Sequence, residues 1–197
     1  MLCALNVAWA FAFALPALPP AAQERVVAQA KAALDVPYLL GGRLRPGADG
    51  LDCQGLVFFA LQPVHRCGWR SLSVMPTASV KGELGLPVAG ASPVSATGLA
   101  DVVATLEPGD VVWWLDTPRN PAEPALTTLD GAPVWVWHVG LYVGAGSVII
   151  GDHFEGKVVQ EDLVAYTRAH YAGVFVTRMK DGPRPTRCRQ HAPMVVR

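Results

Sequence analysis

One segment restricts the fold more than any other: the stretch from Asp52 to Gln62 is apolar on nearly every side. Its apolar residues are Leu56, Val57, Phe58, Phe59, Ala60 and Leu61. A surface helix keeps one polar face, whereas a helix that is apolar all round is normally buried. Pro63 is expected to end this helix, because proline lacks a backbone donor. The chain must therefore fold other layers around a central helix.

A second helix is predicted before the first one, from Ala21 to Leu34. Val26 and Ala30 recur there at helical spacing, while the charged residues fall mainly on other faces. Pro37 is expected to end this helix. Two helices therefore precede the rest of the chain.

Short strands separated by glycine turns make up most of the second half. We predict them at Val111 to Leu115, Val134 to Val143, Val148 to Ile150, Lys157 to Gln160 and Val174 to Arg178. Short strands joined by such turns favour an antiparallel sheet. Helices first and strands afterwards predict an α+β fold, with the N-terminal helices packed on the sheet.

The chain of 197 residues is long enough for one domain with a substantial core. We place this domain at residues 23–179 and expect a basic tail at 180–197. Within the domain, residues 68–104 have little periodicity and room for one short helix. The loop 116–133, rich in Pro and Thr, interrupts the sheet region.

The N-terminal segment, residues 1–22, contains no charged side chain. The apolar run from Leu2 to Leu15 is shorter than the ~20 residues that a spanning helix needs. An apolar run followed by small residues and prolines is typical of a signal peptide. However, no Lys or Arg precedes the run and no clean cleavage site follows it. A buried N-terminal segment or a misassigned start is the alternative. We expect export to the periplasm or cell envelope, without stable membrane insertion after processing.

Charge and cysteine content exclude several classes of protein. Lys plus Arg and Asp plus Glu are both 16, so the basic excess of a nucleic-acid binder is missing. Cleavage of the N-terminal segment would remove Cys3 and leave Cys53, Cys67 and Cys188. An odd number suggests one reactive thiol and one possible pair, Cys67 with Cys188, although both could equally remain thiols. No His, Cys or Asp set has zinc-ligand spacing, so we expect no metal and no cofactor.

The window Gly50 to Val57 places Cys53 in the first turn of the buried helix. A helix N-terminus carries partial positive charge and unpaired N–H groups, which favour the nucleophilic thiolate over the thiol. Asp52 fits as the N-cap, with its side chain turned onto the N–H groups one turn ahead. Cys53 is therefore a candidate nucleophile. The alternative is a small buried residue, as most lone cysteines are.

A second window, Trp135 to Val143, contains the candidate base. A strand period of two puts His138 and Gly140 on one face, with apolar residues on the other. A helix packed over that face could come close enough to bring its thiol within reach of the imidazole. The alternative is a core histidine bonded to a backbone carbonyl.

These windows together resemble the NlpC-type bacterial cell-wall cysteine peptidases, a papain-like family. The resemblance covers roughly Gln23 to Arg178 and is carried by Val36-Pro37-Tyr38 with Gly41-Gly42, by Asp52-Cys53-Gln54-Gly55-Leu56-Val57, by Leu106-Glu107-Pro108-Gly109-Asp110-Val111-Val112 and by His138-Val139-Gly140-Leu141-Tyr142-Val143-Gly144. Gln54 stands where the family more often has Ser. The resemblance implies Cys53 as nucleophile and His138 as base. It also implies that the Tyr38 hydroxyl and the Cys53 backbone N–H hold the oxyanion.

The third catalytic position, a polar residue that orients the base, departs from the family pattern. The usual spacing after His138 leads to Ile150, which cannot orient an imidazole. If Ala145-Gly146 is a two-residue hairpin turn, His138 faces His153 across the strands. A slip of one residue would substitute Asp152. We predict His153, with Asp152 as the alternative.

The resemblance implies an exported cysteine peptidase or amidase that cleaves peptidoglycan stem peptides, commonly between γ-D-glutamate and a diamino acid. Its partners would be these stem peptides, and we expect a monomer. An acyltransferase or thioesterase on the same scaffold is one alternative. A non-catalytic wall-binding domain is another, although the intact pair of Cys53 and His138 argues against it.

Overall fold

The computed structural model describes residues 17–42, 49–65, 73, 82–117 and 125–179. The apolar run up to residue 16, the basic tail, Cys3, Cys67 and Cys188 lie outside these ranges. The expectations about the signal peptide and the disulfide therefore stay predictions. Within the described ranges, no helix is both long and apolar enough to cross a membrane.

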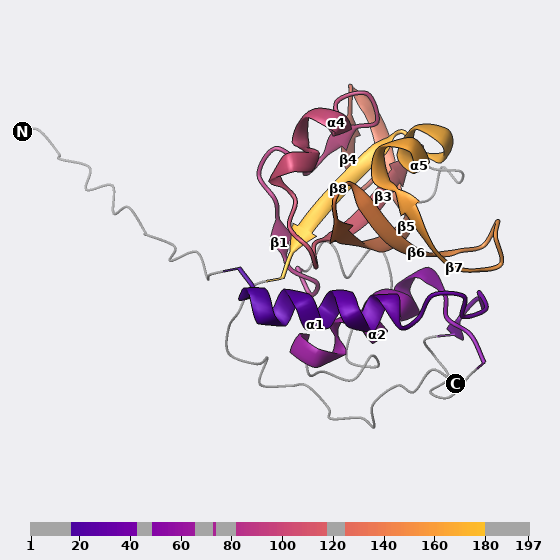
Figure 1. Cartoon of the computed structure of the whole chain (residues 1–197). Coiled ribbons are helices and arrows are strands. Elements are labelled where there is room, and N and C mark those ends of the chain that lie inside the picture. The colour runs from indigo at the N-terminus through magenta and orange to yellow at the C-terminus, as the bar shows by residue number, and fades with distance from the viewer. Residues whose placement is uncertain (1–16, 43–48, 66–72, 74–81, 118–124, 180–197) are drawn as a thin grey trace, which may run out of the picture.

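The described residues form an α+β fold around one antiparallel sheet, as predicted (Figure 1). Its helices are α1 (Pro20–Lys31), α2 (Cys53–His65), α4 (Leu99–Val102), a short 3₁₀ turn η3 (Val103–Thr105) and α5 (Leu163–His170). Its strands are β1 (Leu86–Pro87), β2 (Val94–Ser95), β3 (Val111–Asp116), β4 (Thr127–Leu129), β5 (Ala132–Gly144), β6 (Ser147–Asp152), β7 (Lys157–Asp162) and β8 (Gly173–Arg178). The main strand order is β1-β8-β3-β5-β6-β7, with β2 paired to β8 and β4 to β5.

The predicted elements are found with small shifts, and two are corrected. Helix α2 continues past Pro63 to His65, because the packing of a buried helix outweighs local propensity. The predicted loop 116–133 contains the short strand β4. Helix α5 was not predicted at all, although Asp162 caps it by accepting a hydrogen bond from the Ala165 N–H at 2.8 Å.

Two hydrophobic cores cover the two faces of the sheet. On one face, α1 and α2 pack against β-strand side chains such as Trp113, Val139 and Leu141. On the other face, α4 and α5 enclose a cluster that includes Trp114 and Tyr142. Figure 1 shows α1 and α2 together on one side of the strands, with α4 and α5 beyond the other side. The buried helix predicted from its apolar sequence thus lies in the first of these cores.

A buried ion pair fixes the turn that leads into β3. Asp110 is almost fully buried, and its carboxylate accepts two hydrogen bonds from the Arg178 guanidinium, each 2.8 Å long. Arg178 also donates to Glu107 at 2.7 Å. Burial raises the pKa of Asp110, although the guanidinium opposes this shift. The Glu107 to Asp110 part of the family resemblance therefore has a structural role, since it joins the start of β3 to the end of β8.

The first described residues belong to the folded domain. Leu18 and Ala22 are both buried in the core beneath the sheet, and Pro20 begins α1. A protein that begins at residue 17 keeps these contacts and serves as the reference. Deleting residues 1–22 removes the buried Leu18 and the first turn of α1, which should lower the free energy of unfolding by about 2 kcal/mol or more. Thermal and urea unfolding of the two truncated proteins tests this, and equal stabilities would contradict it.

Candidate active site

The first turn of α2 is held by Asp52, as its predicted capping role requires. One carboxylate oxygen of Asp52 accepts a hydrogen bond from the Gly55 N–H at 2.6 Å. The other accepts from the Gly41 N–H at 3.1 Å. Asp52 thus ties the glycine loop to the helix start and directs its charge onto backbone donors. Cys53 follows as the first residue of α2, and its side chain is buried.

Tyr38 lies beside Cys53 because two chain segments run next to each other. Tyr38 and Leu51 form an isolated parallel bridge, and the Leu39 N–H donates to the Leu51 carbonyl at 3.0 Å. A Cβ atom on Gly42 would lie only 2.6 Å from the Gly50 carbonyl oxygen, so this approach requires glycine. The loop before the helix therefore brings the Tyr38 phenol to the helix N-terminus.

The Tyr38 phenol stays protonated at physiological pH. Burial, followed by the nearby negative charges of Cys53, Asp52 and Asp152, raises its pKa to about 12. Its hydroxyl can therefore donate a hydrogen bond to a developing anion. Cys53 and Asp152 therefore both lie within electrostatic range of Tyr38.

Strand β6 ends against the start of α2. A Cβ atom on Gly151 would lie 3.2 Å from the carbonyl carbon of Asp52 and 3.3 Å from the nitrogen of Cys53. Such contacts are tight, so the absent side chain lets the strand approach the helix closely. The next residue, Asp152, is 3% exposed and accepts a hydrogen bond from the Phe154 N–H at 2.7 Å.

His138 lies on β5, opposite Trp114 of β3, and is 3% exposed. Aromatic rings surround its imidazole. Their centroids lie 5.3 Å away for Trp114, 6.1 Å for Tyr171 and 6.2 Å for Tyr166. We call Trp114, Tyr166 and Tyr171 the aromatic cluster. The His138 Nε2 atom is buried and has no hydrogen-bond partner.

We predicted that the helix carrying Cys53 packs over the face of β5 that holds His138 and Gly140. This prediction is wrong for the body of that helix, α2. Gly140 faces Trp114 and Ile150, on the side of the aromatic cluster. The side chains of α2 pack instead against Val139 and Leu141, because these provide the larger apolar surface for a fully apolar helix. The N-terminus of α2 approaches the sheet at the end of β6 instead.

Burial keeps the His138 imidazole neutral. Burial, followed by the positive charges of His153 and His170, lowers the pKa of His138 to about 3. A neutral imidazole has a lone pair ready to accept a proton. His153, which lowers the pKa of His138, also lies near Tyr38, with ring centroids 6.2 Å apart.

The register between β5 and β6 corrects the argument for His153. The predicted pair of Gly144 and Ser147 is present, but the register shifts between Tyr142 and Gly144. Beyond this shift Gly140 pairs with Ile150, which is the last pair of the two strands; continuing the same register by two residues would place His138 opposite Asp152. His153 is exposed in the turn that follows β6, whereas Asp152 is buried. The observed register differs by one residue from the predicted one. This difference and the burial of Asp152 favour Asp152 as the residue that orients His138.

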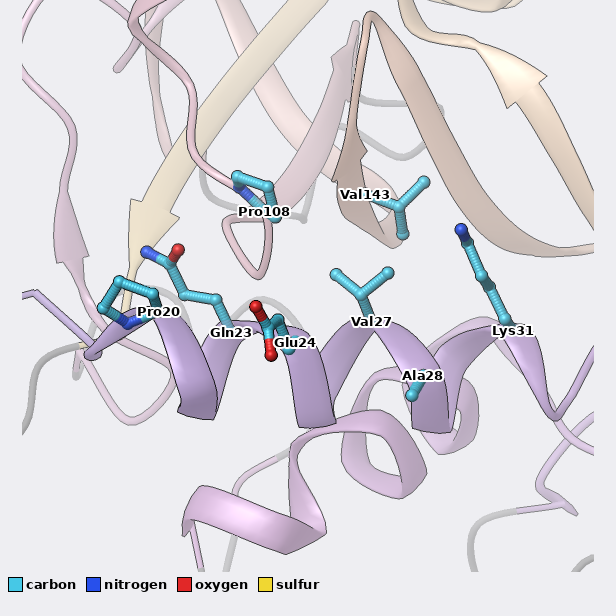
Figure 2. A pocket seen from close by; sticks show the side chains of 8 residues that line it. All are labelled: Pro20, Gln23, Glu24, Val27, Ala28, Lys31, Pro108 and Val143. Atoms are coloured by element: carbon cyan, nitrogen blue, oxygen red, sulfur yellow. The ribbon is translucent and has the colours of Figure 1, made fainter.

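A surface pocket of about 470 Å³ lies elsewhere (Figure 2). Its lining comes from Pro20, Gln23, Glu24, Val27, Ala28 and Lys31 of α1 together with Pro108 and Val143. Figure 2 shows the side chains of Gln23, Val27 and Lys31 extending from α1 on the side of Pro108 and Val143. None of the candidate catalytic residues lines this pocket, so it is separate from the site. Among the residues that the structure describes, no group of three or more His, Cys, Asp or Glu residues could hold a metal ion.

The sequence did not single out the aromatic cluster, chiefly because α5 was not predicted. Two signals were available: Asp162 as an N-cap, and the helical spacing of Leu163, Tyr166 and Thr167. Trp114 is fixed to this helix, since its indole N–H donates to the Thr167 hydroxyl at 2.8 Å. Its position opposite His138 depends on strand register, which the sequence pattern alone leaves open.

Solved structures with this fold are known, while neither a family model nor a curated protein matches the chain. An N-acetylmuramoyl-L-alanine amidase from Bacteroides uniformis is 16% identical, with a TM-score of 0.51, covering 82% of this chain and all of that one. The P60 domain of an antigen from M. avium subspecies paratuberculosis is 19% identical, with a TM-score of 0.50 and coverage of 82% and 97%. NlpC2 from Trichomonas vaginalis is 23% identical, with a TM-score of 0.50 and coverage of 80% and 46%.

The chain thus has the papain-like fold of NlpC and P60 domains, and the predicted resemblance is confirmed at the level of the fold. It spans less than half the length of the Trichomonas vaginalis chain.

Proposed function

We propose that the protein is an exported cysteine hydrolase that cleaves peptidoglycan stem peptides, with Cys53 as nucleophile and His138 as base. The observation that carries this proposal is the position of Cys53. It begins a buried helix whose cap, Asp52, is bonded to backbone N–H groups, and it lies within range of a phenol that stays protonated. The B. uniformis amidase supports the substrate class, since its name describes an enzyme acting on N-acetylmuramoyl-L-alanine.

In the proposed reaction the Cys53 sulfur attacks the carbonyl carbon of the scissile amide while His138 accepts the thiol proton. The negative charge that develops on the carbonyl oxygen is held by the Tyr38 hydroxyl and the Cys53 backbone N–H. His138 then returns the proton to the leaving amine, and the C–N bond breaks to leave a thioester on Cys53. Water, activated by His138, hydrolyses the thioester and releases the new carboxylate.

The proposed bond is the one from γ-D-glutamate to a diamino acid. Export to the periplasm or cell envelope and a monomeric state belong to the same proposal.

We assign the third position to Asp152 rather than His153, following the observed register and burial. Asp152→Asn is expected to lower kcat/KM roughly 10- to 100-fold, as the loss of a charged hydrogen-bond partner does. His153→Gln should change it by less than about threefold, since a surface side chain contributes little. Steady-state kinetics on one stem peptide compares the two variants. A larger loss for His153→Gln would restore the original prediction from the sequence.

An acyltransferase or thioesterase would use the same nucleophile, base and oxyanion donors. Digestion of defined tri- and tetrapeptide muropeptides, followed by mass spectrometry, separates the alternatives. The proposal expects cleavage products that carry a new carboxylate on γ-D-glutamate. Survival of these muropeptides, with cleavage of simple esters or thioesters, would replace the peptidase with an acyl-transfer enzyme. Binding to muropeptides without any turnover would indicate a wall-binding domain.

A further inference from the structure

Two buried side-chain atoms in the described ranges have no hydrogen bond of standard geometry, and both belong to the same site. They are the Nε2 atom of His138 and the hydroxyl oxygen of Tyr166. Buried polar atoms are nearly always hydrogen-bonded, because leaving one unpaired is unfavourable. Both atoms lie on the same face of the sheet, where the rings of the two residues are neighbours. Because both atoms lie at the proposed base, we looked for a function that they share.

The distance between the two rings suits a direct hydrogen bond. The centroids of His138 and Tyr166 are 6.2 Å apart. A phenol oxygen and an imidazole nitrogen both project from their rings toward a partner, and an O···N contact of about 2.8 Å fills the remaining space.

Asp152 is close enough to the Tyr166 hydroxyl to interact with it. The phenol of Tyr166 is kept neutral, since burial, then electrostatic interactions with Tyr171 and Asp152 and hydrogen bonding to the same two side chains, raise its pKa far above the ordinary range. A neutral phenol can accept one hydrogen bond and donate another at the same time. The Asp152 carboxylate is the acceptor available for its proton.

We propose that Tyr166 is a positioning residue that connects Asp152 to His138. The His138 Nε2–H donates to the Tyr166 oxygen, and the Tyr166 O–H donates to the Asp152 carboxylate. This chain holds the proton of the neutral imidazole on Nε2 and leaves the Nδ1 lone pair to accept the thiol proton of Cys53. Tyr166 itself touches neither the substrate nor the thiol. The inference rests on the proposed function. In it, Asp152 orients His138 through Tyr166 and not by direct contact.

Helix α5 is well suited to hold Tyr166 in place. The helix is fixed at its start by the Asp162 cap. In its second turn, the Thr167 hydroxyl accepts from the Trp114 indole and donates to the Leu163 carbonyl at 2.7 Å. Trp114 in turn meets the Tyr166 ring edge-on, with centroids 5.5 Å apart. The phenol is therefore constrained by the same strand that pairs with β5.

The test is Tyr166→Phe, which removes the hydroxyl and keeps the ring. Tyr142→Phe is the matched control, because Tyr142 is a buried tyrosine of the same core whose hydroxyl accepts from the Gly146 N–H at 3.0 Å. The ¹⁵N NMR shifts of His138, assigned with the His138→Gln variant, report its tautomer without any substrate. In the wild type and in Tyr142→Phe, we expect the neutral imidazole at pH 7.5 to carry its proton on Nε2.

In Tyr166→Phe we expect a mixture of tautomers and a loss of kcat/KM of roughly tenfold or more, with a decrease in melting temperature no larger than that of Tyr142→Phe. An unchanged tautomer and unchanged kinetics would overturn the proposal. So would equal activity losses in both tyrosine variants that follow a fall in melting temperature, since these would indicate a packing role. If the wild type cleaves no stem peptide, the proposed function fails, while the tautomer comparison still decides the role of Tyr166.

Discussion

Cys53→Ala is expected to reduce muropeptide hydrolysis by at least roughly 10,000-fold, because the acyl-enzyme cannot form without the sulfur. The fold should remain, since alanine is a small apolar residue that fits the buried start of α2. The capping bond from the Gly55 N–H to Asp52 does not involve the cysteine side chain. Mass spectrometry of the digestion products and a thermal unfolding curve measure the two effects separately.

The other cysteines provide the matched controls for this substitution. Cys67→Ala and Cys188→Ala should retain turnover, although a disulfide between them would make both variants less stable by a similar amount. Loss of turnover in Cys67→Ala, with hydrolysis retained in Cys53→Ala, would show that the nucleophile has been assigned to the wrong residue.

His138→Gln is expected to lower kcat/KM roughly 100- to 10,000-fold, which is the usual contribution of a general base. Glutamine keeps a polar side chain of similar reach but cannot accept the thiol proton. The acid limb of the kcat/KM profile of the wild type should lie below the ordinary histidine pKa of about 6.5, because burial lowers the pKa of His138. An acid limb centred at 6.5 or above would argue that another group controls it.

The same substitution should change how stability depends on pH. In the unfolded chain His138 binds a proton below pH ~6.5, whereas in the folded protein its pKa is lowered to about 3 by burial. Between these two values the unfolded state binds more protons, so the free energy of unfolding falls as pH falls, by up to about 1.4 kcal/mol per pH unit. Above pH ~6.5 this contribution is constant.

Urea unfolding at several pH values between 5 and 8 compares the wild type with His138→Gln. The variant is expected to lose this part of the slope below pH ~6.5. Parallel stability curves for the two proteins would show that His138 is accessible to protons in the folded state.

The sequence was most informative where one physical requirement determined the structure. A helix apolar on every side had to be buried, and α2 is buried. Asp52 before Cys53 suggested an N-cap, and its carboxylate does accept from the Gly55 N–H. Short apolar stretches between glycine turns predicted the antiparallel strands, and β3, β5, β6, β7 and β8 all lie within two residues of their expected ends. Each of these features depends on neighbouring residues in the chain.

Features that depend on long-range register were harder to predict. The irregularity between Tyr142 and Gly144 moves the partners of Gly140, Leu141 and Tyr142 by one residue from the predicted register, and it depends on how β5 and β6 twist together. The aromatic cluster needs α5 to dock on the sheet through Thr167 and Trp114. The face of β5 on which α2 packs likewise depends on which side of the assembled sheet offers the larger apolar surface.

The rate at which Cys53 reacts with iodoacetamide tests the central claim most directly. The reaction is followed at pH 7 by mapping the labelled peptide, beside a small model thiol and the His138→Gln variant. A nucleophile activated by the helix N-terminus and a neutral imidazole should react faster than the model thiol and slow down in the variant. A Cys53 thiol that reacts no faster than the model thiol, at a rate that His138→Gln leaves unchanged, would contradict the account.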